Sequence, residues 1–269
     1  MTYRLVIGNK AWSSWSLRPW LAMRQAGIAF TEINIKLRRP ESKAHILEHS
    51  PSGRVPTLLE DGQVMWDSLA ILEYLAEAHP DARLWPADPK ARALARSVAA
   101  EMHSGFAALR EHCPMDLLVR APMAGLPETV AADVTRIVAL WRDCRRRFGA
   151  SGPMLFGGFT AADAMYAPVA SRLRTYLPDL ARYGDDSTAQ ACCCKKSWGC
   201  SHGRHLARET ARVIRGSDVS FWVSGQQCLK EPCAGLEGGP PRGQLPASVS
   251  RRAPSSQSAM AGRANMAPT

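Results

Sequence analysis

The chain has 269 residues, of which 46% are hydrophobic and 22% charged, as expected of one large or two ordinary globular domains. No apolar run approaches the ~18 residues that a membrane-spanning helix requires, and the first residues do not resemble a secretory signal, so we expect a cytoplasmic protein with no membrane partner. The net charge of +10 does not indicate a nucleic-acid partner, because residues 187–269 hold 11 Lys or Arg against 4 Asp or Glu, whereas residues 1–186 hold 23 against 20.

The first 80 residues predict a domain in which strands and helices alternate. The elements expected in chain order are a strand at 3–8, a helix at about 14–25, a strand at 29–35, a short helix at about 43–49, a hairpin of 55–59 and 63–66, and a helix that Ser68 caps and that ends near His79. The resulting order, β-α-β-α-β-β-α, places a strand, a crossover helix and a second strand first, and closes the sheet with the hairpin and the last helix.

The next hundred residues predict a second domain made of helices. A linker of residues 81–90 leads into helices at about 90–112, 127–148 and 161–176, so we expect an all-α domain over residues 91–186. Thr160 and Asp163 form the T-x-x-D pattern of a capping box at the start of the last helix. Pro168 within this helix predicts a kink or an early break.

Residues 187–269 differ in character from the rest of the chain. They are rich in Gly, Pro and Ser and have almost no hydrophobic periodicity, so we expect a low-complexity, disordered tail. The cysteines at 192–194 are adjacent and do not suit the spacing of a structural zinc site, so we expect no metal. A frameshift that replaced the native C-terminus is our hypothesis for this composition, and it would leave the helical domain incomplete.

Five motifs occur in one order along residues 3–180: WSSWSLRPW, SGRVPTL, WDSLAILEYL, LWPADPKARA and LFGGFTAADAMYAP. Together they resemble the glutathione transferase superfamily. The resemblance implies a thioredoxin-like α/β domain at residues 1–80 that binds glutathione, followed by an all-helical domain. It also implies glutathione as co-substrate, a small electrophile as second substrate, a role in detoxification and a homodimer.

The resemblance implies that Ser13 is the catalytic residue, because it matches the serine of the Ser-type classes. Such a serine donates a hydrogen bond to the glutathione thiolate. Lowering the thiol pKa by ~2 units requires ~2.7 kcal/mol, and a hydrogen bond to a charged group supplies ~1.5–3 kcal/mol. Ser14 and Ser16 are alternatives for this role, and a further alternative is that all three serines only cap the helix.

The other glutathione-binding residues implied by the resemblance are Ser14, Arg54, Val55, Pro56, Asp67 and Ser68. The Val55–Pro56 peptide bond is cis in the family, which leaves the main chain of Val55 free to pair with the cysteinyl unit of glutathione. Asp67 would accept from the γ-glutamyl ammonium group, and Ser68 with the helix N-terminus would bind the α-carboxylate. A plain helix cap is the alternative for these two residues. Arg54 is the candidate for the glycyl carboxylate.

The chemistries of the other classes of this family fit this sequence less well than the serine chemistry does. Tyr3 stands at the beginning of the first strand rather than at its end, and we expect it to pack at the edge of the sheet. No cysteine occurs between Ser13 and Trp15, which disfavours thiol–disulfide exchange. Spaced nine residues apart, His103 and His112 match no common metal pattern and are expected at the surface or at an interface.

Conjugation of glutathione to an electrophile is the function that we expect. Trp15 stands where the zeta class has a cysteine, which disfavours zeta-type isomerisation of maleylacetoacetate, and this reaction is an alternative to conjugation. A non-catalytic protein that binds glutathione or a partner is a second alternative. A basic nucleic-acid-binding module is disfavoured, because the positive charge lies in a tail with few aromatic residues.

Overall fold

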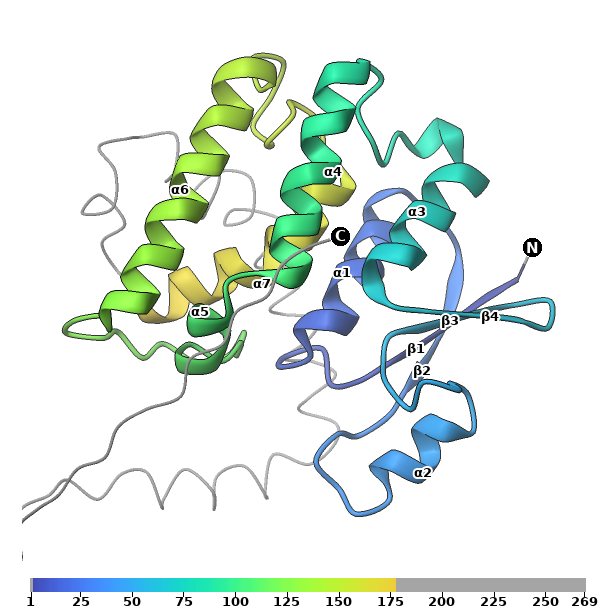
Figure 1. Cartoon of the computed structure of the whole chain (residues 1–269). Coiled ribbons are helices and arrows are strands. Elements are labelled where there is room, and N and C mark those ends of the chain that lie inside the picture. The colour runs from blue at the N-terminus through green and yellow to red at the C-terminus, as the bar shows by residue number, and fades with distance from the viewer. Residues whose placement is uncertain (1, 178–269) are drawn as a thin grey trace, which may run out of the picture. The chain divides into compact units, whose positions relative to one another are not determined.

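The computed structural model describes residues 2–177 (Figure 1). Its sheet has four strands in the order β2-β1-β3-β4, with bounds β1 Tyr3–Ile7, β2 Phe30–Asn34, β3 Thr57–Glu60 and β4 Gln63–Trp66. β1 pairs in parallel with β2 and antiparallel with β3, and β3 pairs antiparallel with β4. The predicted succession of strands and helices along the chain is confirmed, and the hairpin begins at Thr57 rather than at Val55.

Helices cover both faces of this sheet, as its side-chain alternation requires. Leu5 and Ile7 belong to the larger hydrophobic core, whereas Val6 belongs to a smaller core on the other face that also contains Ile46. The three helices are α1 Ser14–Gln25, α2 Ser42–Leu47 and α3 Ser68–Ala78. Figure 1 shows α1 and α3 together on one side of the sheet and α2 on the other. The predicted thioredoxin-like arrangement is confirmed.

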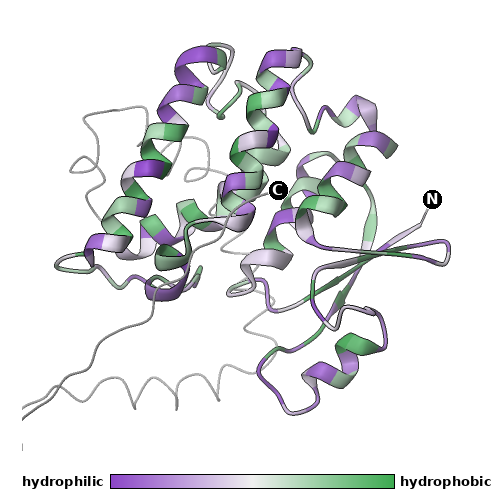
Figure 2. Ribbon diagram, in the orientation of Figure 1, coloured by the Kyte–Doolittle hydropathy of each residue, from purple (hydrophilic) through white to green (hydrophobic). Residues whose placement is uncertain are grey.

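The second part of the described chain is helical, as predicted. Its elements are a short 3-10 helix η1 Pro80–Ala82, α4 Pro89–Ser104, α5 Ala107–His112, α6 Glu128–Phe148 and α7 Ala161–Tyr176. In Figure 2, α6 carries hydrophilic and hydrophobic residues in alternation along its length, as an amphipathic surface helix should. No helix within residues 2–177 is both long and apolar enough to cross a membrane.

One helix of the prediction is two helices in the structure. The expected helix at 90–112 is interrupted at Gly105 and Phe106, and Phe106 adopts a left-handed conformation with φ of 56°. Gly105 closes α4, and a Cβ atom there would lie 2.7 Å from the carbonyl oxygen of Glu101. The close approach of this carbonyl explains why glycine occupies the end of α4.

Helix α7 is the central helix of the helical part. The predicted capping box is present, since the Thr160 side chain accepts from the main chain at the third helical position and the Asp163 side chain accepts from Thr160 N. The expected early break at Pro168 is wrong, because the helix continues to Tyr176. α7 is buried along most of its length and packs against α1 and α4, and this packing offsets the hydrogen bond that proline removes.

The described residues lie within a single compact unit of the chain. The boundaries proposed at residues 80, 90 and 186 therefore stay predictions. The expected tail at 187–269 lies outside the described residues.

Candidate functional site

Strand register brings three separate parts of the sequence to one end of the sheet. Val6, one residue before the end of β1, pairs with Thr57 at the start of β3, and Thr57 also pairs with Trp66 at the end of β4. Ser13 follows β1, Pro56 precedes β3 and Asp67 follows β4. The sequence segments predicted to hold glutathione therefore converge at this end, with α1 and α3 beginning there.

The segment before β3 has the conformation expected of it. The Val55–Pro56 peptide bond is cis, as predicted. Thr57 Oγ1 donates to the carbonyl oxygen of Arg54 at 3.2 Å, which holds the loop against the strand. The Arg54 side chain is exposed and forms no ion pair with any residue that the structure describes, so its cation is available to a carboxylate.

The three candidate serines have different environments at the start of α1. Ser13 is the N-cap, and its Oγ accepts from Ser16 N at 3.4 Å and donates to Ser16 Oγ at 2.8 Å. Ser16 is fully buried, and its hydroxyl also accepts from Gly8 N at 3.0 Å, which makes it a structural residue. Ser14 Oγ accepts from Arg172 Nη2 at 3.5 Å. Ser13 and Ser14 thus stay candidates for contact with a ligand.

Asp67 rather than Ser68 caps α3, which corrects the sequence expectation. Asp67 has a φ of 77°, and its Oδ1 accepts from Leu69 N at 2.8 Å and from Ala70 N at 3.3 Å. Its Oδ2 lies 3.2 Å from His103 Nε2 of α4. Ser68 is the first helical residue and is fully buried, and its Oγ accepts from Arg18 Nη1 at 3.4 Å.

Three arginines surround these residues, and sequence reasoning missed all of them. Burial and the neighbouring Arg172 lower the pKa of Arg18 to about 9, and burial and Arg110 lower the pKa of Arg172 to about 10. The guanidinium carbon of Arg18 lies 4.2 Å from the centre of the Trp15 ring, and that of Arg110 lies 5.7 Å from it. In the sequence, the only signal for a role of these residues was the occurrence of arginine within helical stretches that are otherwise apolar.

The two cysteines in the described part of the chain do not suit redox chemistry. Cys113 and Cys144 are buried and free. Burial raises the pKa of Cys113, and burial together with Asp143 raises the pKa of Cys144 to about 12, so neither is a thiolate at neutral pH. No group of three or more potential metal ligands occurs within residues 2–177, and the cysteines from Cys192 onward lie outside them.

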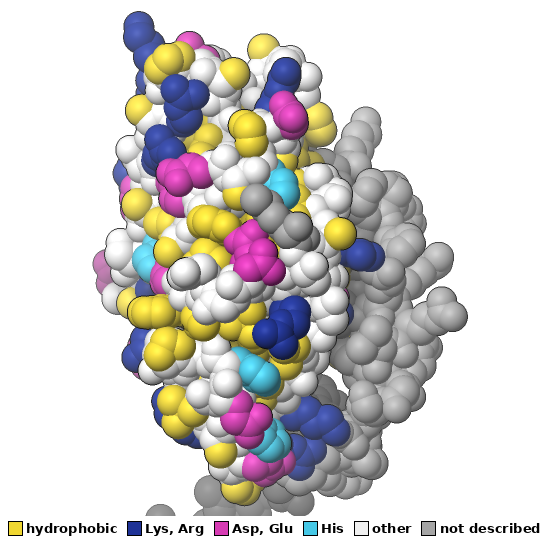
Figure 3. Space-filling view, turned by 90° about the vertical axis from the view of Figure 1, so that its right-hand side faces the viewer, with side chains coloured by type: hydrophobic (Ala, Val, Ile, Leu, Met, Phe, Trp, Pro, Cys, Tyr) yellow, Lys and Arg dark blue, Asp and Glu magenta, His cyan; other side chains and the backbone are white. Residues whose placement is uncertain are grey.

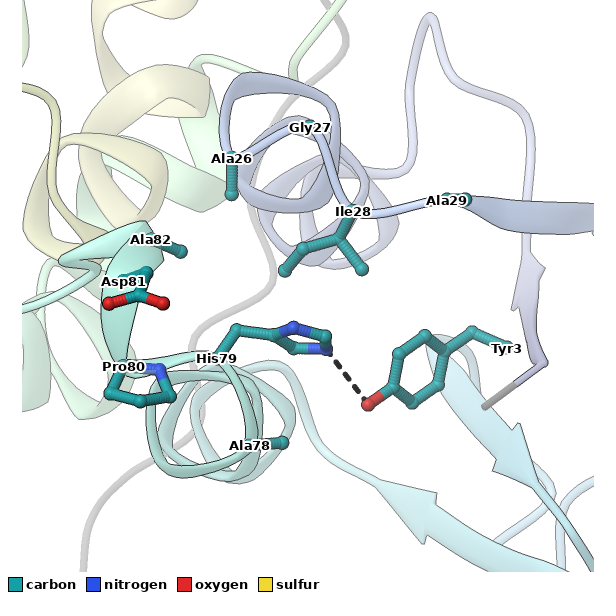
Figure 4. A pocket seen from close by; sticks show the side chains of 10 residues that line it. All are labelled: Tyr3, Ala26, Gly27, Ile28, Ala29, Ala78, His79, Pro80, Asp81 and Ala82. Carbon is teal, nitrogen blue, oxygen red and sulfur yellow. Dashed lines mark hydrogen bonds between the residues drawn. The ribbon is translucent and has the colours of Figure 1, made fainter.

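A surface pocket of about 620 Å³ lies at the opposite end of the sheet (Figure 4). It is lined by the start of β1 and by the C-terminal ends of α1 and α3, and Tyr3 Oη and His79 Nε2 form a hydrogen bond of 3.0 Å within it. Tyr3 is 2% exposed on β1, an interior strand, so the expectation of a sheet-edge position is wrong. The pocket is separate from the candidate site.

Comparison with known proteins agrees with this geometry. The family "Glutathione S-transferase, N-terminal domain" matches residues 12–78, and "Glutathione S-transferase, C-terminal domain" matches residues 127–191. A probable maleylacetoacetate isomerase of Caenorhabditis elegans is 39% identical over 105 residues, which are 39% of this chain and 48% of that protein. Glutathione S-transferase GstA of Escherichia coli O157:H7 is 32% identical over 102 residues, 35% of this chain and 51% of that protein.

The match to curated relatives spans about half of their length. Among solved structures, a glutathione transferase homologue from Burkholderia with bound glutathione aligns with a TM-score of 0.54 and 20% identity, and covers 79% of this chain and 99% of that one. This likeness shows the fold. With both domain families matched in order on a thioredoxin-like sheet and a helical domain, the chain belongs to the glutathione transferase superfamily.

Proposed function

We propose that the protein is a glutathione transferase that adds the glutathione thiolate to an electrophilic carbon. The observation that carries the proposal is the convergence of Ser13, the cis Val55–Pro56 bond and Asp67 at one end of the sheet. These groups match the parts of an extended tripeptide: a thiol, a main chain with free hydrogen-bonding groups, and an ammonium group.

Ser13, Val55 and Asp67 act on three different parts of glutathione in this mechanism. Ser13 turns its hydroxyl proton from Ser16 Oγ to the thiolate, while Ser16 Oγ keeps its bond from Gly8 N. The N-terminus of α1 adds its positive dipole end. The main chain of Val55 pairs with the cysteinyl unit, and Asp67 accepts from the ammonium group with its Oδ2 atom.

The remaining contacts are to the two carboxylates of glutathione. Arg54 binds the glycyl carboxylate, and the start of α3 at Ser68 binds the α-carboxylate. The thiolate then attacks: its electron pair forms a C–S bond, and the leaving group departs with the electrons of the bond that breaks. Holding thiolate and electrophile together supplies the proximity that a bimolecular reaction in water lacks.

A zeta-type isomerase is the second candidate function. The relatives named as maleylacetoacetate isomerases favour it, with 39% identity for the one from Caenorhabditis elegans. The positive field of Arg18, Arg110 and Arg172, which interact with one another, also favours an anionic substrate, without direct contact of the buried Arg18 and Arg172. In this reaction the thiolate would add to a cis double bond, the resulting single bond would rotate, and elimination would return the thiolate.

The proposal includes the setting in which the enzyme works. We propose a cytoplasmic homodimer that acts in detoxification, with glutathione as co-substrate and no metal. Figure 3 shows hydrophobic side chains in several patches among charged and histidine side chains on the face that lies to the right in Figure 1. On β4, Val64 is 37% exposed and Trp66 48% exposed. Light scattering would give the mass of the particle in solution.

Two assays on the purified full chain test the function. Conjugation of glutathione to 1-chloro-2,4-dinitrobenzene, followed by absorbance, reports transferase activity. The cis–trans isomerisation of maleylacetoacetate in the presence of glutathione reports the alternative. Turnover in the first assay supports the transferase, turnover confined to the second replaces it with the isomerase, and glutathione binding by calorimetry without either would leave a binding protein.

A further inference from the structure

Arg172 of α7 is a buried cation that has no anionic partner among residues 2–177. It is 4% exposed, and its Nε donates to the carbonyl oxygen of Cys113 at 2.8 Å. Its Nη2 donates to Ser14 Oγ, and its Nη1 has no partner within the described residues. No carboxylate of residues 2–177 forms an ion pair with it.

The groups around Arg172 increase the free-energy cost of burying its positive charge. Arg110 of α5 and Arg18 of α1 are further cations, and the other titratable groups that affect it are Cys113 and Tyr176, which are neutral at pH 7. A buried charge is normally paired, because desolvation is expensive. The described part of the chain thus holds positive charge behind the start of α1, and none of its own carboxylates pairs with Arg172 to balance it.

The guanidinium cannot meet a ligand directly without a rearrangement, because it is buried and held by Cys113 O. Its route to the site is Ser14, which follows Ser13 at the first turn of α1. Since the oxygen of Ser14 accepts from Arg172, its proton is free to be donated elsewhere. A hydroxyl that accepts from a cation is also a stronger donor.

We propose that Arg172 is a positioning residue for the glutathione thiolate: it orients the Ser14 hydroxyl toward the sulfur and supplies the buried charge that balances the thiolate. This inference rests on the proposed function. Ser13 and Ser14 then both donate to the sulfur. The anion that the arginine lacks in the free protein arrives with the substrate.

The test uses the absorbance of glutathione thiolate bound to the full chain, titrated with pH. The variants are Arg172→Met, which removes the charge at similar length, and Arg172→Lys, which keeps it. Arg174→Met is the matched control, since Arg174 is exposed on the same helix two residues further on. Thermal unfolding of each free protein is measured alongside.

We expect Arg172→Met to raise the pKa of the bound thiol by about 1 unit or more, with Arg172→Lys close to wild type and Arg174→Met unchanged. Thermal stability should fall little, because the desolvation cost of the unpaired buried charge disappears together with the hydrogen bond to Cys113 O. In a Ser14→Ala background, Arg172→Met should raise the pKa of the bound thiol by less than it does in the wild type, because the two residues act through one interaction.

The outcomes are distinguishable. If wild type shows a thiolate signal and Arg172→Met leaves the thiol pKa unchanged, the inference is overturned and the proposed function stands. If the shift is as large in the Ser14→Ala background, Arg172 does not act through Ser14, and the positioning role is overturned. If wild type binds glutathione without a thiolate signal, the proposed function itself fails.

Discussion

Asp67 Oδ2 and His103 Nε2 lie 3.2 Å apart, which joins the start of α3 in the sheet domain to the last turn of α4 in the helical part. The two carboxylate oxygens of Asp67 have separate partners, because Oδ1 caps the helix. His103 also packs edge-on against Trp15, with ring centres 5.2 Å apart. The oxygen proposed to accept from the glutathione ammonium group is therefore held at the junction of both parts of the chain.

Asp67→Asn should weaken glutathione binding without unfolding the protein. The amide oxygen can still cap α3, whereas the negative charge that attracts the ammonium group is lost. We expect the KM for glutathione to rise about tenfold, the equivalent of one charge-assisted hydrogen bond, with kcat little changed. Steady-state kinetics at varied glutathione concentration measures both constants.

Asp88→Asn is the matched control for this experiment. Asp88 caps α4 through a bond of 2.7 Å from Ala91 N and belongs to no part of the candidate site. An equal rise of KM in both variants would show that loss of a helix cap, rather than loss of charge at the ammonium site, explains the result.

The buried Asp163 should make stability depend on pH. Its carboxylate accepts from Leu155 N at 3.0 Å and from Thr160 N and Oγ1 at 2.8 Å each. Burial outweighs these bonds and raises its pKa from 3.8 to about 6. The native state therefore binds the proton more tightly than the unfolded chain. The contribution of Asp163 to the free energy of unfolding falls as the pH rises from 3.8 to about 6, and it is constant above pH 6.

Asp163→Asn should remove this pH dependence and lower stability. At pH 7 we expect a loss of about 1–3 kcal/mol, because the single amide oxygen of Asn cannot replace both carboxylate oxygens, which accept from Leu155 N and Thr160 N. Urea unfolding of both proteins at several pH values between 4 and 7 measures the difference, which should shrink as the pH rises. A difference that stays constant over this range would contradict the assigned pKa.

Tyr74 should contribute to stability but not to catalysis. Its hydroxyl donates to Glu60 Oε2, and Glu60 is buried on β3 at the end of the sheet away from the candidate site. This hydrogen bond raises the pKa of Tyr74 to about 12. Tyr74→Phe leaves the carboxylate short of a donor and should cost about 2 kcal/mol in the free energy of unfolding. Chemical denaturation gives this loss, and an altered KM for glutathione would contradict the placement.

Features set by residues close in sequence could be predicted. The capping box of Thr160 and Asp163 spans four residues, and the α1 and α3 boundaries follow from local spacing and polar caps. The cis Val55–Pro56 bond came from the resemblance of its segment to the family. Both Asp67 and Ser68 were candidates for the cap of α3, and the sequence favoured Ser68, since Asp-Ser offers two capping side chains in a row.

Features set by residues far apart in sequence could not be predicted. The contact of Arg172 with Ser14 joins residues 158 positions apart, and no local pattern indicates it. The break at Gly105 was ambiguous, because a single glycine is tolerated inside helices and only the carbonyl of Glu101 makes it necessary. Pro168 suggested a break that packing around α7 overrides.

The central claim is that Ser13 stabilises the thiolate of bound glutathione. The measurement that tests it most directly is the ultraviolet absorbance of bound thiolate against pH in the wild type and Ser13→Ala, with the exposed Ser97→Ala as control. We predict a thiolate signal at neutral pH in the wild type and Ser97→Ala, and a thiol pKa at least about 1 unit higher in Ser13→Ala. An unchanged pKa in Ser13→Ala would contradict the account.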